Sequence, residues 1–333
     1  MMEKELRVAV VGFGKMGMLH TGILNVLPSV KLVAICEKSD LVRRFLKRAV
    51  KAVQVVDCVE KLSGLGLDAV YVTTPTEAHF PVVKSLYERG IARDVFVEKP
   101  LASNFDEARQ LCSLARKTDG VNMVGYLRRF YATFMRAKEL LDDGVIGKPY
   151  TFRAYAYSSD FFGANGNPKV KTPRAGVVRD LGSYALDLAL WFFGDLRVEG
   201  ANIESVVNGG SMDSAQLKAK ASDGIVGEVY VSWCVDGYRM PEVGFLIEGS
   251  KGCLSVNDDE LAVDLKDGTR WKWFRHDLGD QVGFWLGLPE YYREDKCFVE
   301  AAIRGEPVEP CFETAAKVDR LIDEFLAKAG WVG

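Results

Sequence analysis

The chain has 333 residues, of which 48% are hydrophobic and 27% charged, and a formal net charge of −3 at pH 7. This length is enough for two domains of ordinary size. The charge argues against a nucleic-acid-binding protein, which carries a concentrated basic patch. We see no apolar run of about 18 residues, as a membrane span needs, and no room for a signal peptide before the first predicted strand. Seven cysteines without a C-x-x-C pair and only three histidines predict free thiols in a reducing cytoplasm and no metal site.

The first 125 residues alternate short apolar runs with amphipathic helical stretches. The predicted strands are Leu6–Val11, Lys31–Cys36, Ala69–Thr73, Asp94–Val97 and Val121–Val124. The predicted helices between them are Met16–Leu27, Leu41–Val50, Ala78–Gly90 and Asp106–Lys117. Strands that are apolar throughout and separated by helices are typical of a parallel sheet covered on both faces. We therefore predict an α/β fold that begins with a doubly wound Rossmann domain over residues 1–125, with a helical connection to about residue 148.

Residues 149–333 show the pattern of an α+β domain. Ala215–Ala221 and Glu228–Trp233 alternate with period two, and Asp-Gly pairs at 223–224 and 267–268 signal turns. These features predict a large, mostly antiparallel sheet with one covered and one open face. The predicted helices of this domain are Leu181–Phe193, Glu290–Arg304 and Phe312–Lys328. We expect the open face, with residues such as Tyr230 and Trp233, to join copies of the chain into a homodimer or homotetramer.

A glycine-rich motif, G-F-G-K-M-G, follows the first strand and opens a helix. Its first glycine, Gly12, permits a tight turn, Gly14 lets the backbone approach a pyrophosphate, and Gly17 lets helix and strand pack closely. The helix N-terminus offers unpaired N–H groups to the phosphates. The three remaining residues of the motif are expected to line the same dinucleotide site: Phe13, Lys15 and Met16. A glycine-rich turn without a ligand is the alternative.

Glu37 lies 20 residues beyond Gly17, at the end of the second strand. A carboxylate at this place accepts hydrogen bonds from the adenosine ribose and repels a 2′-phosphate, which favours NAD. Lys38 and Ser39 follow directly and leave NADP possible, because they can pair with that phosphate.

Two further loops follow strands of the first domain and are expected to line the cofactor crevice, because ligands bind beyond the carboxyl ends of parallel strands. The first, T-T-P-T-E-A-H, supplies the predicted cofactor contacts Thr73, Thr74, Pro75 and His79. A helix start capped by Thr76 is the alternative. The second is Glu98-Lys99-Pro100, where the lysine charge would polarise a substrate oxygen. Its alternative is a surface lysine before a helix.

In the second domain, D-L-G-S-Y-A-L-D places Asp180, Tyr184 and Asp187 on one face of a strongly apolar helix. A polar stripe on such a helix is costly unless it faces a cleft. The alternative is that Asp180 caps the helix and Tyr184 is a core aromatic.

Taken in order, these motifs resemble the glucose–fructose oxidoreductase / inositol dehydrogenase / MocA family. The similarity runs from G-F-G-K-M-G-M-L-H through T-P-T-E-A-H, E-K-P-L-A and V-G-Y-L-R-R-F to D-L-G-S-Y-A-L-D. The resemblance implies an NAD(P)-dependent enzyme that transfers hydride between a nicotinamide and a hydroxyl or carbonyl group of a sugar, polyol or related diol. It implies that Lys99 is the catalytic lysine and that Asp180 lies near the reacting hydroxyl.

Tyr184 stands where the family's D-x-G-x-H motif usually has histidine, as in the branch with glucose–fructose oxidoreductase and the dihydrodiol and xylose dehydrogenases. A tyrosine acts as acid or base where a nearby cation favours its ionised form, and we expect Lys99 to be that cation. The resemblance further implies that Glu98 and Arg128 contact the cofactor and that Tyr126 and Arg129 contact the substrate with Lys99, Asp180 and Tyr184. The insertion Phe161–Arg174 carries Lys169, Lys171 and Arg174. Their charges are typical of a solvated loop, and the alternative is a lid whose positive charge favours an acidic substrate.

Two other functions stay open at this point. One is an NAD-dependent glycoside hydrolase of the same family, which would accumulate no NADH. The other is a catalytically silent dinucleotide-binding protein, suggested by the missing histidine. The retention of Lys99, Asp180 and Tyr184 argues against the second.

Overall fold

The computed structural model describes residues 5–50, 52–162, 176–206, 212–280 and 289–331. The chain divides into two compact units. The N-terminal unit comprises Met1–Tyr126 and Leu286–Ala316, and the C-terminal unit comprises Leu127–Trp285 and Lys317–Gly333. This division differs from the predicted boundary in two places. Residues 127–148, expected as a connection, cluster with the C-terminal unit, and the chain returns to the N-terminal unit before its last helix.

The N-terminal unit contains a six-stranded sheet in the order β3-β2-β1-β4-β5-β6, and all its neighbouring pairs are parallel. The strands are β1 (Leu6–Val11), β2 (Val30–Cys36), β3 (Gln54–Val56), β4 (Ala69–Val72), β5 (Asp94–Glu98) and β6 (Asn122–Gly125). Residues of β4 and β5 are buried throughout, as expected of strands covered on both faces. The predicted Rossmann sheet is confirmed, with β3 as a short strand that the sequence pattern did not reveal.

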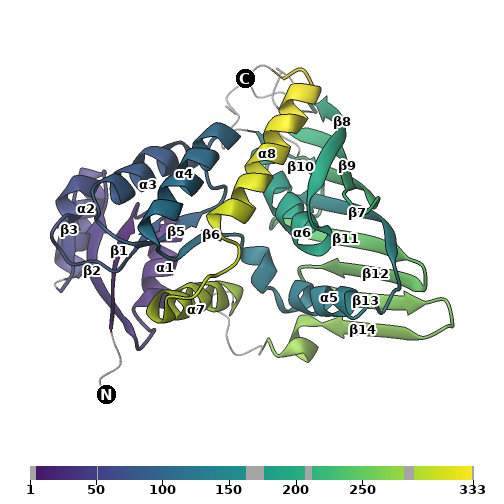
Figure 1. Ribbon diagram of the computed structural model, residues 1–333, viewed down its shortest axis with the longest axis horizontal. Helices are drawn as coiled ribbons and strands as arrows, with labels where there is room; N and C mark the ends of the chain where they lie inside the picture. Colours follow the sequence, from purple (N-terminus) through teal and green to yellow (C-terminus); the bar gives the residue numbers. More distant parts are fainter. Residues whose placement is uncertain (1–4, 51, 163–175, 207–211, 281–288, 332–333) are drawn as a thin grey trace. The chain divides into compact units, whose positions relative to one another are not determined.

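Helices cover both faces of this sheet (Figure 1). They are α1 (Lys15–Leu24), α2 (Asp40–Ala49), α3 (His79–Glu88), α4 (Phe105–Thr118) and α7 (Pro289–Arg304), with 3-10 turns η1 (Val59–Leu62) and η2 (Thr76–Ala78). α3 packs against α4, and α1 packs against α7. Although α7 comes from the last fifth of the chain, it also contacts β1 and β6 and so completes the cover of the Rossmann sheet.

The C-terminal unit contains an eight-stranded sheet in the order β14-β13-β12-β11-β7-β10-β9-β8. The strands are β7 (Pro149–Tyr157), β8 (Leu196–Glu204), β9 (Ser214–Ala221), β10 (Val226–Ser232), β11 (Glu242–Gly249), β12 (Gly252–Asn257), β13 (Glu260–Leu265) and β14 (Arg270–Phe274). Its pairs are antiparallel except β7 with β10. The mostly antiparallel sheet and both Asp-Gly hairpins are therefore confirmed.

The helical elements of this unit are η3 (Leu127–Phe130), α5 (Ala132–Asp142), the π-helical turn η5 (Val178–Gly182), α6 (Ser183–Phe193), η6 (Arg275–Leu278) and the part of α8 (Phe312–Lys328) from Lys317 onward. α6 packs against β7 and β11, and α5 packs against β12 and β13 (Figure 1). Phe152 on β7 stacks on Phe193 of α6, with ring centroids 4.6 Å apart. Because side chains of a strand alternate between its faces, Arg153 and Tyr155 lie on the opposite, open face.

The open face holds Tyr230, as expected, but not Trp233. Tyr230 is half-buried, whereas Trp233 is only 1% exposed and packs edge-on against Phe161. The two residues are three positions apart, so period two puts them on opposite faces of the sheet. The expectation that both need partners was therefore wrong for Trp233. Lys169, Lys171 and Arg174 of the suggested lid lie outside the described residues.

Within the part of the chain that the structure describes, no helix has the length and apolar character needed to cross a membrane.

Candidate active site

The loop between β1 and α1 depends on glycine at two positions. Gly12 has φ +93°, and a Cβ there would lie 2.9 Å from the backbone nitrogen of Thr74. A Cβ on Gly17 would lie 2.0 Å from the carbonyl oxygen of Gly12. At Gly14, in contrast, a Cβ would meet no described atom within 4 Å. The first and third glycines are thus required by packing, while the second borders open space that a ligand can occupy.

The start of α1 suits an anion. Gly14 is its N-cap, no side-chain hydrogen bond caps the helix among the described residues, and its first turn holds no acidic residue. The unpaired N–H groups and the positive end of the helix dipole therefore remain for a ligand, as a pyrophosphate requires. Phe13, Lys15 and Met16 lie in this loop and first turn, with Lys15 exposed and the other two half-buried.

The carboxylate of Glu37 is fixed by two backbone groups. Its Oε2 accepts a hydrogen bond from the N–H of Phe13, and its Oε1 accepts one from the N–H of Ser39, both at 2.7 Å. Phe13 belongs to the glycine loop, so these bonds hold Glu37 beside the candidate pyrophosphate site. Each carboxylate oxygen keeps a further lone pair, and that is the acceptor capacity that ribose hydroxyls need.

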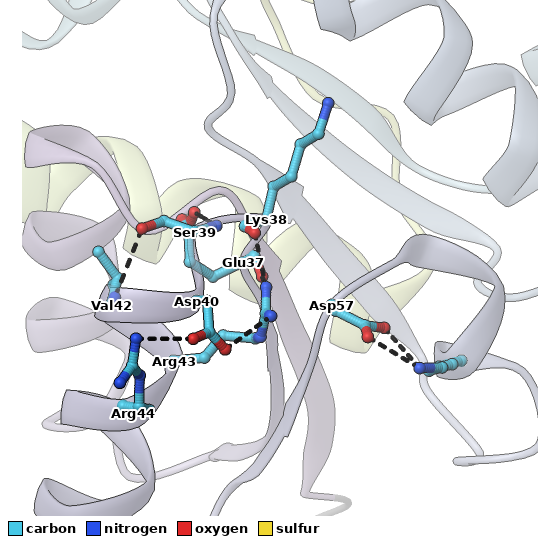
Figure 2. Close-up of polar contacts among 9 residues, drawn as sticks. Glu37, Lys38, Ser39, Asp40, Val42, Arg43, Arg44 and Asp57 are labelled. Carbon is cyan, nitrogen blue, oxygen red and sulfur yellow. Dashed lines mark hydrogen bonds and ion pairs between the residues drawn. The ribbon is translucent and has the colours of Figure 1, made fainter.

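Basic side chains near Glu37 are largely paired with other groups (Figure 2). Nη1 of Arg43 donates to the carbonyl oxygens of Glu37 and Lys38, at 2.9 and 2.6 Å, and its Nη2 contacts Asp40 at 3.2 Å. Arg44 pairs with Asp40 at 2.8 Å. The side chain of Lys38 extends away from the Glu37 carboxylate in Figure 2. Arg43 therefore stabilises the backbone around Glu37 more than it offers a free cation to a phosphate.

The loop after β4 touches the glycine loop directly. Oγ1 of Thr73 donates to the carbonyl oxygen of Gly12, at 2.7 Å. Oγ1 of Thr74 is buried and has no hydrogen-bond partner among the described residues. Buried hydroxyl groups are normally hydrogen-bonded, so a polar group of a bound dinucleotide would suit as the partner of this hydroxyl. Pro75 follows as the N-cap of η2.

His79 lies in the interior instead of facing a ligand. It is 1% exposed, with Nδ1 2.8 Å from the carbonyl oxygen of Pro100 and Nε2 2.9 Å from that of Thr74. Burial lowers the pKa of His79 below its ordinary value, so the ring is neutral and donates to one carbonyl at a time. His79 connects the loops that follow β4 and β5. It therefore supports these two loops from the interior, instead of contacting the cofactor directly as predicted.

Glu98 and Lys99 end β5 in the N-terminal unit. Glu98 is 9% exposed, and its Oε2 accepts a hydrogen bond from the backbone N–H of Lys99, at 3.1 Å. Lys99 is half-buried. Tyr126, the last residue of this segment of the unit, is 1% exposed.

In the C-terminal unit, Asp180 lies within the π-helical turn η5 that runs into α6, so it does not cap the helix. It is 7% exposed, and its Oδ2 accepts a hydrogen bond from Nε1 of Trp233, at 3.2 Å. Tyr184 is half-buried, whereas every other residue from Gly176 to Leu190 is buried. A core aromatic would be buried like its neighbours, so this exposure favours a functional role. π-Helical turns often occur at functional sites.

Arg128 and Arg129 are held in buried ion pairs inside the C-terminal unit. Arg128 donates to both carboxylate oxygens of Asp258, at 3.1 and 3.0 Å. Arg129 donates to both oxygens of Asp187, at 2.8 and 2.7 Å. Both guanidinium groups are nearly fully buried. Burial disfavours the charge of Arg128, but Asp258 outweighs this effect and raises the pKa of Arg128 above its usual range. These pairings give both arginines structural partners that the sequence did not reveal.

Comparison with known protein families agrees with this geometry. Residues 6–126 match the model of an oxidoreductase family with an NAD-binding Rossmann fold, and residues 134–255 match the C-terminal domain of the same Gfo/Idh/MocA group. The chain belongs to the Gfo/Idh/MocA family of oxidoreductases. It is thus an oxidoreductase with an NAD-binding Rossmann domain, and the glycine loop, Glu37 and Thr74 fit that cofactor.

Relatives of this family member carry the names of polyol dehydrogenases. A scyllo-inositol 2-dehydrogenase (NAD(+)) of Bacillus subtilis is 26% identical over 69% of this chain and 68% of its own length. A myo-inositol 2-dehydrogenase of Thermotoga maritima is 24% identical over 91% of this chain and 90% of its own. Among solved structures, a levoglucosan dehydrogenase in complex with NADH and levoglucosan has a TM-score of 0.87 at 19% identity, over 98% of this chain and 97% of that one. At this identity the structural likeness shows the fold alone.

Sequence reasoning missed two parts of this family member's site region. Asp258, the partner of Arg128, lies 130 positions further along the chain, and nothing in its neighbourhood marks it. The other is His20, which stands in G-F-G-K-M-G-M-L-H but was given no role. It is fully buried between two carboxylates, from Glu98 and Asp295. The motif itself was the signal that pointed to this histidine.

Proposed function

We propose that this oxidoreductase acts on a hydroxyl or carbonyl group of a sugar, polyol or related diol. The observation that carries the proposal is the position of Lys99: it directly follows β5, the neighbour of β4, whose loop packs on the glycine loop. An ammonium group at that place suits stabilisation of an alkoxide oxygen. The names of the inositol 2-dehydrogenases and of a D-apiose dehydrogenase, 25% identical over 80% of this chain, support a polyhydroxylated substrate.

NAD, when bound, supplies the acceptor or donor of the hydride. The chain's own residues do the rest in this proposal. The glycine loop residues 12–17 hold the pyrophosphate, Glu37 accepts from the adenosine ribose, and Thr73 and Thr74 line the cofactor. The alternative is NADP, with its 2′-phosphate paired with Lys38 and Ser39.

Lys99, Asp180 and Tyr184 take the catalytic roles in this proposal. Tyr184 exchanges the proton of the substrate hydroxyl, and Lys99 stabilises the negative charge on its oxygen. Asp180, which also accepts the indole N–H of Trp233, orients the substrate. The guanidinium of Arg128 lies 4.3 Å from the centroid of the Tyr184 ring, so Tyr184 has a cationic side chain beside it within its own unit.

A spectrophotometric screen tests this function directly. Purified protein is mixed with NAD or NADP and a panel of sugars, polyols and sugar acids, and absorbance at the reduced-nicotinamide band is followed. We expect net NADH formation with at least one polyhydroxylated substrate. Hydrolysis of a glycoside without net NADH would instead identify a glycoside hydrolase, and no substrate-dependent change with any compound would support a silent binding protein.

We further propose that the open face of the eight-stranded sheet joins two or four copies of the chain. This face has a hollow of about 340 Å³ lined by Arg153, Tyr155, Tyr157, Tyr230 and Leu246, among others. Leu246 is 38% exposed, and exposed apolar and aromatic groups on one face are typical of interfaces. Light scattering at micromolar concentration should give a dimer or tetramer, and Leu246→Arg should dissociate it. A monomeric wild-type protein would contradict this proposal.

For the compartment we propose a reducing cytoplasm, because all seven cysteines are free thiols. Fractionation of the source cells, with thiol titration of the isolated protein, tests this. Oxidised cysteines in the native protein would argue for another compartment.

A further inference from the structure

A buried charge cluster lies within the N-terminal unit, where α1, β5 and α7 meet. His20 of α1 is completely buried. Its Nδ1 lies 2.7 Å from Oδ1 of Asp295 on α7, and its Nε2 lies 3.1 Å from Oε1 of Glu98 on β5. Asp295 is also completely buried. The ring thus joins two carboxylates that lie 197 positions apart in the sequence, from residue 98 to residue 295.

The partners of His20 fix its protonation. An ionised carboxylate only accepts hydrogen bonds, so each ring nitrogen of His20 must donate one, and only the imidazolium form carries a proton on both. Burial opposes a charged ring, but Asp295 and Glu98 outweigh this effect and raise the pKa of His20 well above its ordinary value. His79 in the same unit is the counterexample, because its partners are carbonyl oxygens and burial lowers its pKa.

The groups that face His20 come from every element around it. Tyr71 of β4 and Phe96 of β5 lie with ring centroids 5.6 and 5.2 Å from the imidazole, and Tyr291 of α7 lies at 5.9 Å. Glu294 of α7 contributes a third carboxylate, since its oxygen, one of Asp295 and a His20 nitrogen lie within 4.8 Å of one another. This spacing also suits a metal ion. A metal needs a nitrogen lone pair, however, and an imidazolium has none to offer.

Glu98 connects this cluster to the candidate catalytic loop. One oxygen of its carboxylate contacts His20, and the other accepts a hydrogen bond from the backbone N–H of Lys99. Rotation of the carboxylate would break both bonds together. The charged ring of His20 therefore fixes the position of the Glu98 carboxylate, which accepts from the Lys99 backbone N–H. Asp295 in turn fixes the His20 ring to α7.

We propose that His20 is a positioning residue: as an imidazolium clamped between Glu98 and Asp295, it fixes the carboxylate that orients the main chain of Lys99. This inference rests on the proposed function, because it requires Lys99 to act on the substrate. It also gives α7 a role, since a helix from the last fifth of the chain supplies the second carboxylate of the clamp.

The first experiment measures the ring directly and needs no activity. The chain has only three histidines, so protein with ¹⁵N-labelled histidine gives few ring signals, and His79→Gln and His276→Gln assign them by loss. At pH 8 in the wild-type protein, we expect both His20 nitrogens to be protonated and His79 to show one protonated nitrogen. A neutral His20 ring at pH 8, or His20 signals that move on addition of Zn²⁺ or EDTA, would overturn the clamp.

The second experiment measures the consequence for catalysis. His20→Gln alone leaves two buried carboxylates without their cation and risks misfolding. The pair His20→Gln with Asp295→Asn removes one positive and one negative charge, so the net charge of the cluster is unchanged. We expect kcat to fall by about tenfold or more, because small displacements of a catalytic group are costly. The KM for substrate and the Kd for NAD should stay within about twofold, and the exposed control His276→Gln should match the wild type.

Two results would contradict the positioning role. One is an unchanged kcat in the double variant, and the other is a loss of NAD affinity as large as the loss of kcat, which would mean that the cluster supports cofactor binding. Failure of the proposed function looks different. The wild-type protein would then show no nicotinamide-linked activity with any substrate, and the positioning role of His20 would fall with it. The NMR result would still decide whether the imidazolium clamp exists.

Discussion

The guanidinium carbon of Arg128 lies 4.3 Å from the centroid of the Tyr184 ring. Arg128 is itself immobilised by two hydrogen bonds to Asp258 and one to the carbonyl oxygen of Pro241. A guanidinium over an aromatic ring makes a cation–π interaction, so Arg128 helps to orient the Tyr184 ring. The sequence suggested Lys99 as the cation beside Tyr184, and the structure offers Arg128 within the same unit as the tyrosine.

This relationship makes Tyr184→Phe the most informative substitution in the C-terminal unit. The change keeps the ring under Arg128 and removes only the hydroxyl group. We expect kcat to fall by about 10²-fold, as for the loss of a positioned acid or base, while the free energy of unfolding changes by no more than about 1 kcal/mol. Steady-state kinetics and thermal unfolding of the same preparation measure both.

Tyr184→His serves as the control for this experiment. Imidazole restores a titratable group, so part of the rate should return, with the pH profile moved towards the lower range in which histidine titrates. A core aromatic gives the reverse order, with Phe tolerated and His damaging. A fully active Tyr184→Phe enzyme would end the catalytic assignment.

For Lys99, we expect Lys99→Met to lower kcat by about 10²-fold or more, because the lost charge acts mainly in the transition state. The Kd for NAD should change little, since the glycine loop and Glu37 remain. Stopped-flow absorbance and calorimetry separate the two quantities. Near-normal turnover would show that the Glu-Lys-Pro motif has a structural task here.

Cofactor preference follows from the position of Glu37. The wild-type protein should bind NAD at least several-fold more tightly than NADP, because the carboxylate accepts from ribose hydroxyls and repels a 2′-phosphate. In Glu37→Ala we expect NAD affinity to fall by about tenfold or more, the value of a charged hydrogen bond, and the preference to disappear. Titration calorimetry with both cofactors measures this.

Asp40→Asn is the matched control for Glu37. Asp40 is a nearby carboxylate that pairs with Arg43 and Arg44, and Arg43 keeps its bonds to the Glu37 and Lys38 carbonyl oxygens when Asp40 is neutral. Its substitution should leave the NAD preference intact. Tighter binding of NADP by the wild-type protein would instead identify Lys38 and Ser39 as the determinants.

Much of the fold was accessible from local sequence patterns. Strands such as β4 are continuous apolar runs, and α8 was predicted over the residues that it occupies. The short strand β3 was not, because it has three residues with exposure that falls from Gln54 to Val56, too few for a periodic pattern. The helix α7 was found, but a linear reading assigned it to the C-terminal domain, since nothing local shows that a chain returns to an earlier sheet.

The same distinction between local and long-range features applies to the candidate site. Gly12, Gly17 and Glu37 were predictable because their tasks are set by the strand and turn in which they lie. The partners of Arg128 and His20 were not predictable. Asp258 lies 130 positions after Arg128, and Asp295 lies 275 positions after His20, and ion pairs over such separations leave no local sequence signature. Both arginines of the loop after β6 were therefore assigned to ligands, although each has a buried carboxylate partner.

The ion pair of Arg129 with Asp187 predicts a large effect on stability. Asp187 is 1% exposed, so Asp187→Asn leaves a buried guanidinium without its charged partner, a loss that typically costs about 3–5 kcal/mol. The ion pair of Arg320 with the exposed Asp195 is the control, because Asp195→Asn should cost about 1 kcal/mol or less. Urea unfolding measures both. If both substitutions changed the free energy of unfolding equally, Asp187 would not be the residue that stabilises the buried charge of Arg129. That result would favour the predicted contact of Arg129 with the substrate.

The raised pKa of His20 predicts how stability depends on pH. The ring titrates near its ordinary value of 6.5 in the unfolded chain but keeps its proton well above that in the folded protein. Above about pH 6.5 the folded state therefore binds one proton more than the unfolded state, and the free energy of unfolding falls as pH rises, by up to about 1.4 kcal/mol per pH unit. Near pH 6.5 the His79 ring is partly protonated in the unfolded chain, whereas burial lowers its pKa and keeps it neutral in the folded protein. This offsets part of the slope equally in both proteins and vanishes about one pH unit higher. Chemical unfolding between pH 6.5 and 8.5 should thus show a steeper loss of stability for the wild type than for the variant with His20→Gln and Asp295→Asn. Parallel slopes for the two proteins would mean that His20 is already neutral in the folded state, and the clamp between Glu98 and Asp295 would then lack its cation.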